Sequence, residues 1–167
     1  MNLEGSKNTD ELTARLSDLD ARCRHEAREK LVSMGVAVLP VLYEKLSSPD
    51  WHVRWEAAKA LGQIGDPSAA EALVGLLQDD DTSVRWAAMG SLINLGRGSL
   101  RSVLEALTRD FHSSRLREGV HHILHTLHNR GKLTGVEAEV FHALEGAAPG
   151  VEAAWAANKA LIAERDL

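Results

Sequence analysis

Hydrophobic positions follow a helical period along most of the chain, and the same frame returns about every thirty residues. The clearest copies are DWHVRWEAAKAL at residues 50–61 and DTSVRWAAMGSL at residues 81–92. In both copies apolar residues recur at spacings of three and four, which is typical of a helix with one buried side. The pattern therefore predicts a tandem array of similar helices.

Each of the first three frames begins with an aspartate and ends with a glycine. A short carboxylate accepts a hydrogen bond from an amide of the first helical turn, and glycine tolerates the left-handed backbone that ends many helices. The aspartates are Asp20, Asp50 and Asp81, and the glycines are Gly35, Gly65 and Gly96. A second, shorter apolar segment follows each frame, so we expect a repeating helix–turn–helix unit.

We expect these units to form one domain that spans residues 1–167. One unit of this kind cannot bury its apolar side alone, so neighbouring units must stack on each other. The expected parts are an N-terminal half-unit at 9–17, repeats at 20–47, 50–78, 81–110 and 113–146, and a C-terminal capping helix at 150–164.

The frame Asp-x-x-Val-Arg-x-x-Ala-x-x-x-Leu-x-x-x-Gly resembles the short bacterial HEAT repeat that occurs in phycobilisome-lyase subunits. The resemblance covers about residues 10–165. It implies an all-α fold, a right-handed α-solenoid of about five repeats in which each unit packs on its neighbours. It also implies that the repeat arginine pairs with an acidic residue of an adjacent repeat; these arginines are Arg24, Arg54, Arg85 and Arg117.

The chain has four tryptophans among only seven aromatic residues, and their helical positions differ from those of the core. At 100° per residue, Val53 and Leu61 fall on one side of their helix and Trp55 falls on the other. Equivalent positions align across a stack of repeats, which gives the row His25, Trp55, Trp86, Glu118 and Trp155. In the HEAT family this side lines the concave face, where partners usually bind.

One turn after Trp86, Gly90 leaves a position without a side chain on the same side of its helix. We expect a dent there, walled by tryptophan and by His122. Because tryptophan often dominates binding energy, we expect this face to bind a protein or peptide partner. The expected partner-binding residues are Trp51, Trp55, Lys59, Trp86, Gly90, Asn94, Glu118 and His122. Trp155 belongs either to this site or to the cap.

The segment EGVHHILHTLHNRG at residues 118–131 gives an alternative function. Imidazoles one helical turn apart, together with a carboxylate, have the spacing that binds a transition metal. The histidines are His121, His122, His125 and His128. A metal or small ligand beside Gly90 is therefore the second hypothesis, whereas a solvated helix face is the simpler explanation, and no metal is assigned.

Composition excludes several other classes. A net charge of −5 argues against tight, sequence-independent nucleic-acid binding, which needs clustered basic residues. The single cysteine, Cys23, excludes an internal disulfide and occupies an apolar repeat position. No phosphate-loop or hydrolase motif is present, so we expect no cofactor and no enzymatic activity. With no membrane span or secretory leader in the sequence, we expect a cytoplasmic monomer.

Overall fold

The computed structural model describes residues 3–146 and 148–165, and within them every regular element is a helix. The α-helices are α1 (Leu3–Ala14), α2 (Ala21–Ser33), α3 (Leu39–Lys45), α4 (Trp51–Ile64), α5 (Ala70–Gly75), α6 (Thr82–Leu95), α7 (Arg97–Arg109), α8 (Ser114–Asn129), α9 (Gly135–Leu144) and α10 (Pro149–Arg165). Short 3-10 segments cover Arg15–Ser17, Gly35–Val38, Pro67–Ala69 and Leu76–Gln78. The shorter apolar segments that follow the first two frames, which we expected to be the second helices of their repeats, are thus partly 3-10 helix.

The predicted ends of the long helices are confirmed. Asp20 accepts a hydrogen bond from the amide of Arg22, and Asp50 and Asp81 do the same at the starts of α4 and α6. Gly35, Gly65 and Gly96 all have positive φ angles. Local chemistry therefore sets where each repeat begins and turns.

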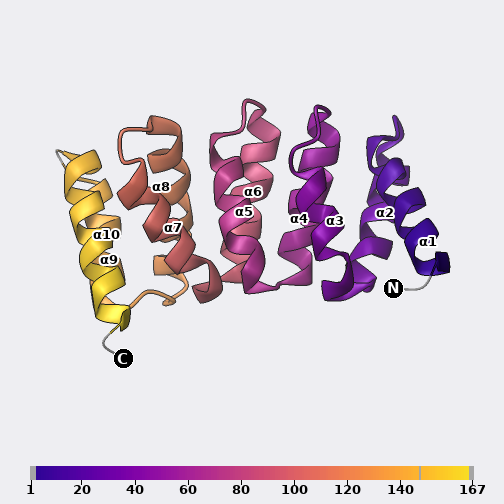
Figure 1. Cartoon of the computed structure of the whole chain (residues 1–167). Helices are drawn as coiled ribbons and strands as arrows, with labels where there is room; N and C mark the ends of the chain where they lie inside the picture. The colour runs from indigo at the N-terminus through magenta and orange to yellow at the C-terminus, as the bar shows by residue number, and fades with distance from the viewer. Residues whose placement is uncertain (1–2, 147, 166–167) are drawn as a thin grey trace.

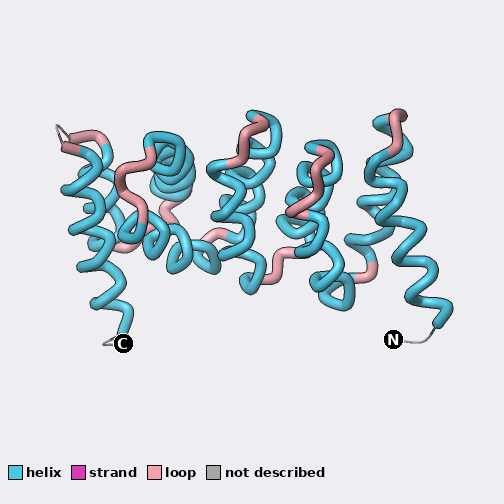
Figure 2. The backbone as a smooth tube through the Cα atoms, turned by 45° about the horizontal axis from the view of Figure 1, so that its top comes forward, coloured by secondary structure: helices cyan, strands magenta, loops and turns pink. Residues whose placement is uncertain are grey.

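The helices form two layers along the array, with the N- and C-terminal units at opposite ends (Figure 1). In the first layer α2, α4, α6 and α8 stack in sequence, and in the second layer α5 packs on α7. Helices α3 and α5 also contact the next first-layer helix, which joins the layers. Short turns connect the helices throughout (Figure 2). This is an α-solenoid, whose core consists mainly of leucine, alanine and valine.

Helices α4 and α6 of the first layer approach each other closely, and two small residues make this possible. Gly62 faces Ser91, and a Cβ atom added at Gly62 would lie 2.7 Å from the Ser91 Cα atom. The Ser91 hydroxyl donates a hydrogen bond of 2.8 Å to the Ala58 carbonyl. The two helices therefore meet almost backbone to backbone.

The repeat arginines hold the turns that precede their own helices. Arg24, Arg54 and Arg85 each donate to two carbonyls five and six residues earlier, and Arg117 donates to the carbonyl of Phe111. The acidic partner that the resemblance implies is present only for Arg24 and Arg54. Arg54 makes two hydrogen bonds to Asp79, and Arg24 lies 3.6 Å from Glu56. For Arg85 and Arg117 no carboxylate of the described residues is within ion-pair distance.

The array changes its arrangement at the C-terminal end. Helix α9 packs on α8, and α10 packs on α9 and on α7 of the second layer. At one end of this unit, the buried carboxylate of Glu137 receives two hydrogen bonds of 3.0 Å from Arg97. The expected row that placed Trp155 beside Glu118 is therefore wrong, because α9 takes the position next to α8.

Candidate partner-binding face

A groove of about 460 Å3 lies between α4 and α6 on the exposed side of the first layer. Its lining residues are Trp55, Lys59, Gln63, Trp86, Ala87, Gly90, Ser91 and Asn94. Five of them belong to the partner-binding set expected from sequence. The floor is open at Gly90, where an added Cβ atom would meet nothing within 4 Å. We call this feature the Gly90 groove.

The two tryptophans of the groove differ in how they are held. Trp55 is partly buried and packs against the core. The Lys59 ammonium lies 4.3 Å from the centroid of its ring and the Arg28 guanidinium 5.8 Å, so two cations flank the aromatic surface. Trp86 is 55% exposed and has no such support. The Trp55 side chain is thus held in place by its neighbours, whereas more than half of the Trp86 surface is exposed to solvent.

Lys59 carries a charge that no carboxylate of the described residues neutralises within ion-pair distance. Burial lowers the pKa of Lys59, and repulsion from the neighbouring Arg28 lowers it further. Across the groove, Asn94 is exposed, and none of the hydrogen bonds found among the described residues involves its side chain. A cation and an amide therefore border the aromatic walls.

A buried charged cluster supports Trp55 from below. Arg28 and Glu56 are 4% and 1% exposed, and they form an ion pair between α2 and α4. Arg28 also donates to Gln63, whose amide group donates to Glu29. Because the ion pair between Arg28 and Glu56 is almost completely buried from solvent, its geometry and additional hydrogen bonds must offset a large desolvation cost. The cluster fixes Arg28 beneath the Trp55 ring.

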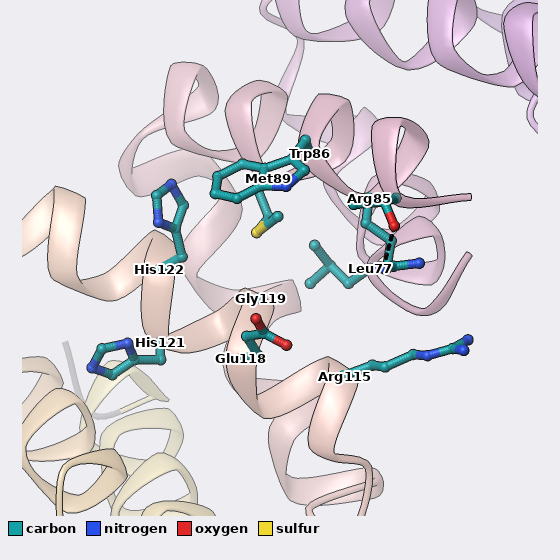
Figure 3. Close-up of a pocket in the computed structure, with 10 residues that line it drawn as sticks. Leu77, Arg85, Trp86, Met89, Arg115, Glu118, Gly119, His121 and His122 are labelled. Carbon is teal, nitrogen blue, oxygen red and sulfur yellow. Dashed lines mark hydrogen bonds between the residues drawn. The ribbon is translucent and has the colours of Figure 1, made fainter. Parts of the chain in front are cut away.

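A second pocket, of about 240 Å3, lies between α6 and α8 on the other side of Trp86 (Figure 3). Trp86 and His122 meet edge to face, with ring centroids 5.0 Å apart. The Glu118 side chain extends into this pocket, and Arg85 and Arg115 lie at its other end (Figure 3). His121 points away from Trp86 (Figure 3).

The expected residues therefore divide between two hollows that share Trp86. Trp55, Lys59, Gly90 and Asn94 line the groove, whereas Glu118 and His122 line the second pocket. His122 does not wall the dent at Gly90, because the space beside Gly90 opens toward α4 and not toward α8. Trp51 lines neither hollow; it stacks on His52 with ring centroids 3.8 Å apart.

The other histidines of α8 pack against α9. The Phe141 ring of α9 lies between 5.1 and 5.8 Å, centroid to centroid, from the rings of His121, His125 and His128. His121 also lies 3.9 Å from a Glu145 oxygen. In the described part of the chain, no three His, Cys, Asp or Glu side chains are grouped so that they could hold a metal ion. These three histidines therefore lie beside Phe141 at the contact between α8 and α9.

Sequence reasoning left Arg28, Gln63 and Ser91 out of the site. The signal for Arg28 was available, because arginine stands where the next two repeats have Ala58 and Met89. A charged residue at a core position predicts a charged partner nearby. Choosing Glu56 as that partner required the packing of α2 on α4.

Comparison with known proteins identifies the repeat family. The family model for HEAT repeats matches residues 9–93 and again residues 39–124, which together cover more than half of the chain. The chain therefore belongs to the HEAT-repeat family. The phycobilisome-lyase subtype that the sequence resembles is narrower than this match.

A solved structure with a similar chain is the crystal structure of an engineered protein, a target of the Northeast Structural Genomics Consortium. It is 23% identical, the match covers 100% of this chain and 88% of that one, and the TM-score is 0.39. No curated protein gives a significant match. Among the helices described, none is long and apolar enough to cross a membrane.

Proposed function

We propose that this HEAT-repeat protein is a non-catalytic binding module whose Gly90 groove receives an apolar side chain of a protein partner. HEAT-type solenoids use extended surfaces of this kind for binding. The proposal is supported by the open space at Gly90, a helix position without a side chain. Two tryptophans border this space: Trp55 is packed against its neighbours, and Trp86 is 55% exposed. An apolar group that enters this space contacts aromatic surface on both sides.

The polar groups of the groove add a chemical preference. Lys59 lies at the rim with no carboxylate partner among the described residues, so a carboxylate of the partner would neutralise a charge that burial already disfavours. Asn94 adds a donor and an acceptor for a backbone peptide group. The proposed partner segment therefore carries an apolar residue next to an acidic one.

The experiment fills the groove without disturbing the fold. Gly90→Leu places a side chain where the structure has open space, and Gly75→Leu is the matched control, because Gly75 is also helical, exposed and free of close neighbours. Partners captured from lysate by the wild-type protein are identified and then titrated directly by calorimetry. We expect Gly90→Leu and Trp86→Ala each to weaken binding by at least about tenfold, as for a hot-spot position.

Gly75→Leu should bind like the wild type, and circular dichroism should show unchanged helix content in all variants. Equal affinity of the wild type and Gly90→Leu would contradict the proposal. Loss of binding in Gly75→Leu alone would place the partner on the opposite layer.

A further inference from the structure

The outer side of α10 carries a stripe of exposed apolar side chains far from the Gly90 groove. Val151, Trp155 and Ile162 are 65%, 68% and 52% exposed. At 100° per residue they fall within about 40° of one another on one side of the helix, where the exposed Asn158 lies between Trp155 and Ile162. The alanines on the opposite side of α10 are buried against the rest of the array: Ala153, Ala156, Ala157 and Ala160.

A hollow lies beside this stripe and extends it onto α9. It is about 410 Å3, and Glu139 and Ala143 of α9 line it together with Val151 and Trp155. Large contiguous apolar patches on a protein surface commonly mark an interaction site. The apolar side chains and the adjoining hollow are therefore a candidate interaction site.

The charges along the stripe indicate which occupant fits. Glu152 and Lys159 lie on the same flank, seven residues apart, and Lys159 is 2.7 Å from Glu139. If two copies of α10 pack antiparallel about a two-fold axis, the same flank of each helix lies on the same side of the interface. With the axis near Ala156, Glu152 of each copy then faces Lys159 of the other.

The same arrangement aligns the apolar residues. Trp155 lies next to its own symmetry mate near the axis, and Val151 lies opposite Ile162 of the other copy. A parallel pair would place the charged flanks on opposite sides of the interface and would lose this match. Charge and apolar surface therefore agree only in the antiparallel pair.

We propose that α10 and the adjoining edge of α9 form a self-complementary face through which two copies of this chain associate as an antiparallel dimer. A helix of 17 residues is about 25 Å long, which is short for an interface that normally buries about 800 Å2 per partner. The dimer should therefore be weak, with a dissociation constant in the micromolar range. The sequence led us to expect a monomer, and this stripe is the feature at odds with that expectation.

Sedimentation equilibrium of the full chain between about 1 and 500 µM tests the association, because a micromolar dimer changes mass across that range. We expect the wild type to pass from monomer to dimer and Trp155→Glu to stay monomeric. The matched control is Trp86→Glu, which alters a tryptophan that is 55% exposed on the other surface and should dimerise like the wild type. The proposal does not depend on the partner-binding function.

The orientation has its own test. In the Glu139→Gln background, which removes the ion pair that Lys159 makes within its own chain, Glu152→Lys and Lys159→Glu should each weaken dimerisation about tenfold, because two like-charge contacts form per dimer. The double variant should recover most of the loss. A wild type that is monomeric at every concentration overturns the proposal. Dimerisation abolished by Trp86→Glu but not by Trp155→Glu assigns the contact to the Gly90 groove instead, and failure of the double variant to recover overturns the antiparallel arrangement.

Discussion

Two glycines on neighbouring first-layer helices have opposite structural roles. Gly62 lies in the contact between α4 and α6, where an added Cβ atom would lie 2.7 Å from the Ser91 Cα atom. Gly90, on the next helix, has open space where its Cβ atom would lie. The first glycine is required for close packing, whereas the second keeps a groove empty and lowers helix propensity.

We therefore expect Gly62→Ala to lower the free energy of unfolding by about 1–3 kcal/mol, because the backbones must separate to admit the methyl group. Gly90→Ala should raise it by about 0.5–1 kcal/mol through helix propensity alone. Urea denaturation followed by circular dichroism measures both values. A stabilising effect of Gly62→Ala would show that the contact with Ser91 yields easily.

The tryptophans show what residue patterns predict and what they miss. The helical period indicated that Trp86 lies outside the core, and it is exposed. The same reasoning predicted that Trp55 is exposed in the same way. Instead, Trp55 is partly buried and flanked by Lys59 and Arg28. Lys59 lies one turn later on the same helix, whereas Arg28 comes from α2, so the sequence of the Trp55 helix accounts for only one of the two flanking cations.

At the scale of the element, the repeat arginine joins a helix to the turn before it. Arg54 adds a contact to Asp79, the first residue after the 3-10 segment Leu76–Gln78, with distances of 2.7 and 2.8 Å. Asp79 also accepts from the amide of Asp81, the residue that caps α6. One buried carboxylate thus fixes both α4 and the start of α6.

The stability of this element should depend on acid pH. Burial opposes ionisation of Asp79, but hydrogen bonds from Arg54 and from the Asp81 amide outweigh it, so the pKa of Asp79 lies below its ordinary value. A lowered pKa means that the contribution is complete above the unfolded pKa, near 3.9. It is lost as pH falls through the lower pKa of the folded state.

Asp79→Asn should therefore lower the free energy of unfolding by about 1.5–3 kcal/mol at pH 7, the range for hydrogen bonds to charged groups. The difference from wild type should shrink below about pH 4, where Asp79 of the unfolded chain becomes protonated, and should vanish once the folded-state carboxylate is protonated at lower pH. Denaturation at several pH values measures this. The control is Asp80→Asn, whose side chain is 99% exposed and which should change little; a pH-independent difference for Asp79→Asn would contradict the assignment.

At the scale of the whole molecule, most contacts between units join neighbours along the array, and an exception is α10, which also packs on α7. Stability in such a solenoid is a sum of local terms, so damage at one end should stay near that end. The C-terminal end depends on Phe141, which is 5% exposed and packs against three histidine rings of α8.

Phe141→Ala should cost about 3–5 kcal/mol locally and speed amide hydrogen exchange in α8, α9 and α10. Protection in α2 and α4 should stay at the wild-type level, because those helices make no contact with the damaged unit. Leu31→Ala, at a fully buried position of α2, is the reciprocal control and should affect the N-terminal end. Faster exchange along the whole array in either variant would show that the solenoid unfolds as one cooperative unit.

The resemblance of the repeat to HEAT repeats implied the solenoid architecture. The sequence by itself determined the repeat and the ends of the long helices. These depend on contacts between residues close in the chain: an aspartate caps its own helix, a glycine ends it, and the apolar period selects the buried side. The repeat also aligns equivalent positions between units, which is why the sequence alone predicts that Trp55, Trp86 and Gly90 lie together.

Only the tertiary structure decided which neighbours share a hollow and where the array changes its arrangement. The spacing and tilt between helices depend on side-chain volumes in both partners, such as Gly62 against Ser91. After α8 the repeat pattern is no longer regular. In this part of the chain α9 packs on α8, and α10 packs on α7 of the second layer. Helical periodicity specifies which side of a helix is buried; it does not specify which helix covers it.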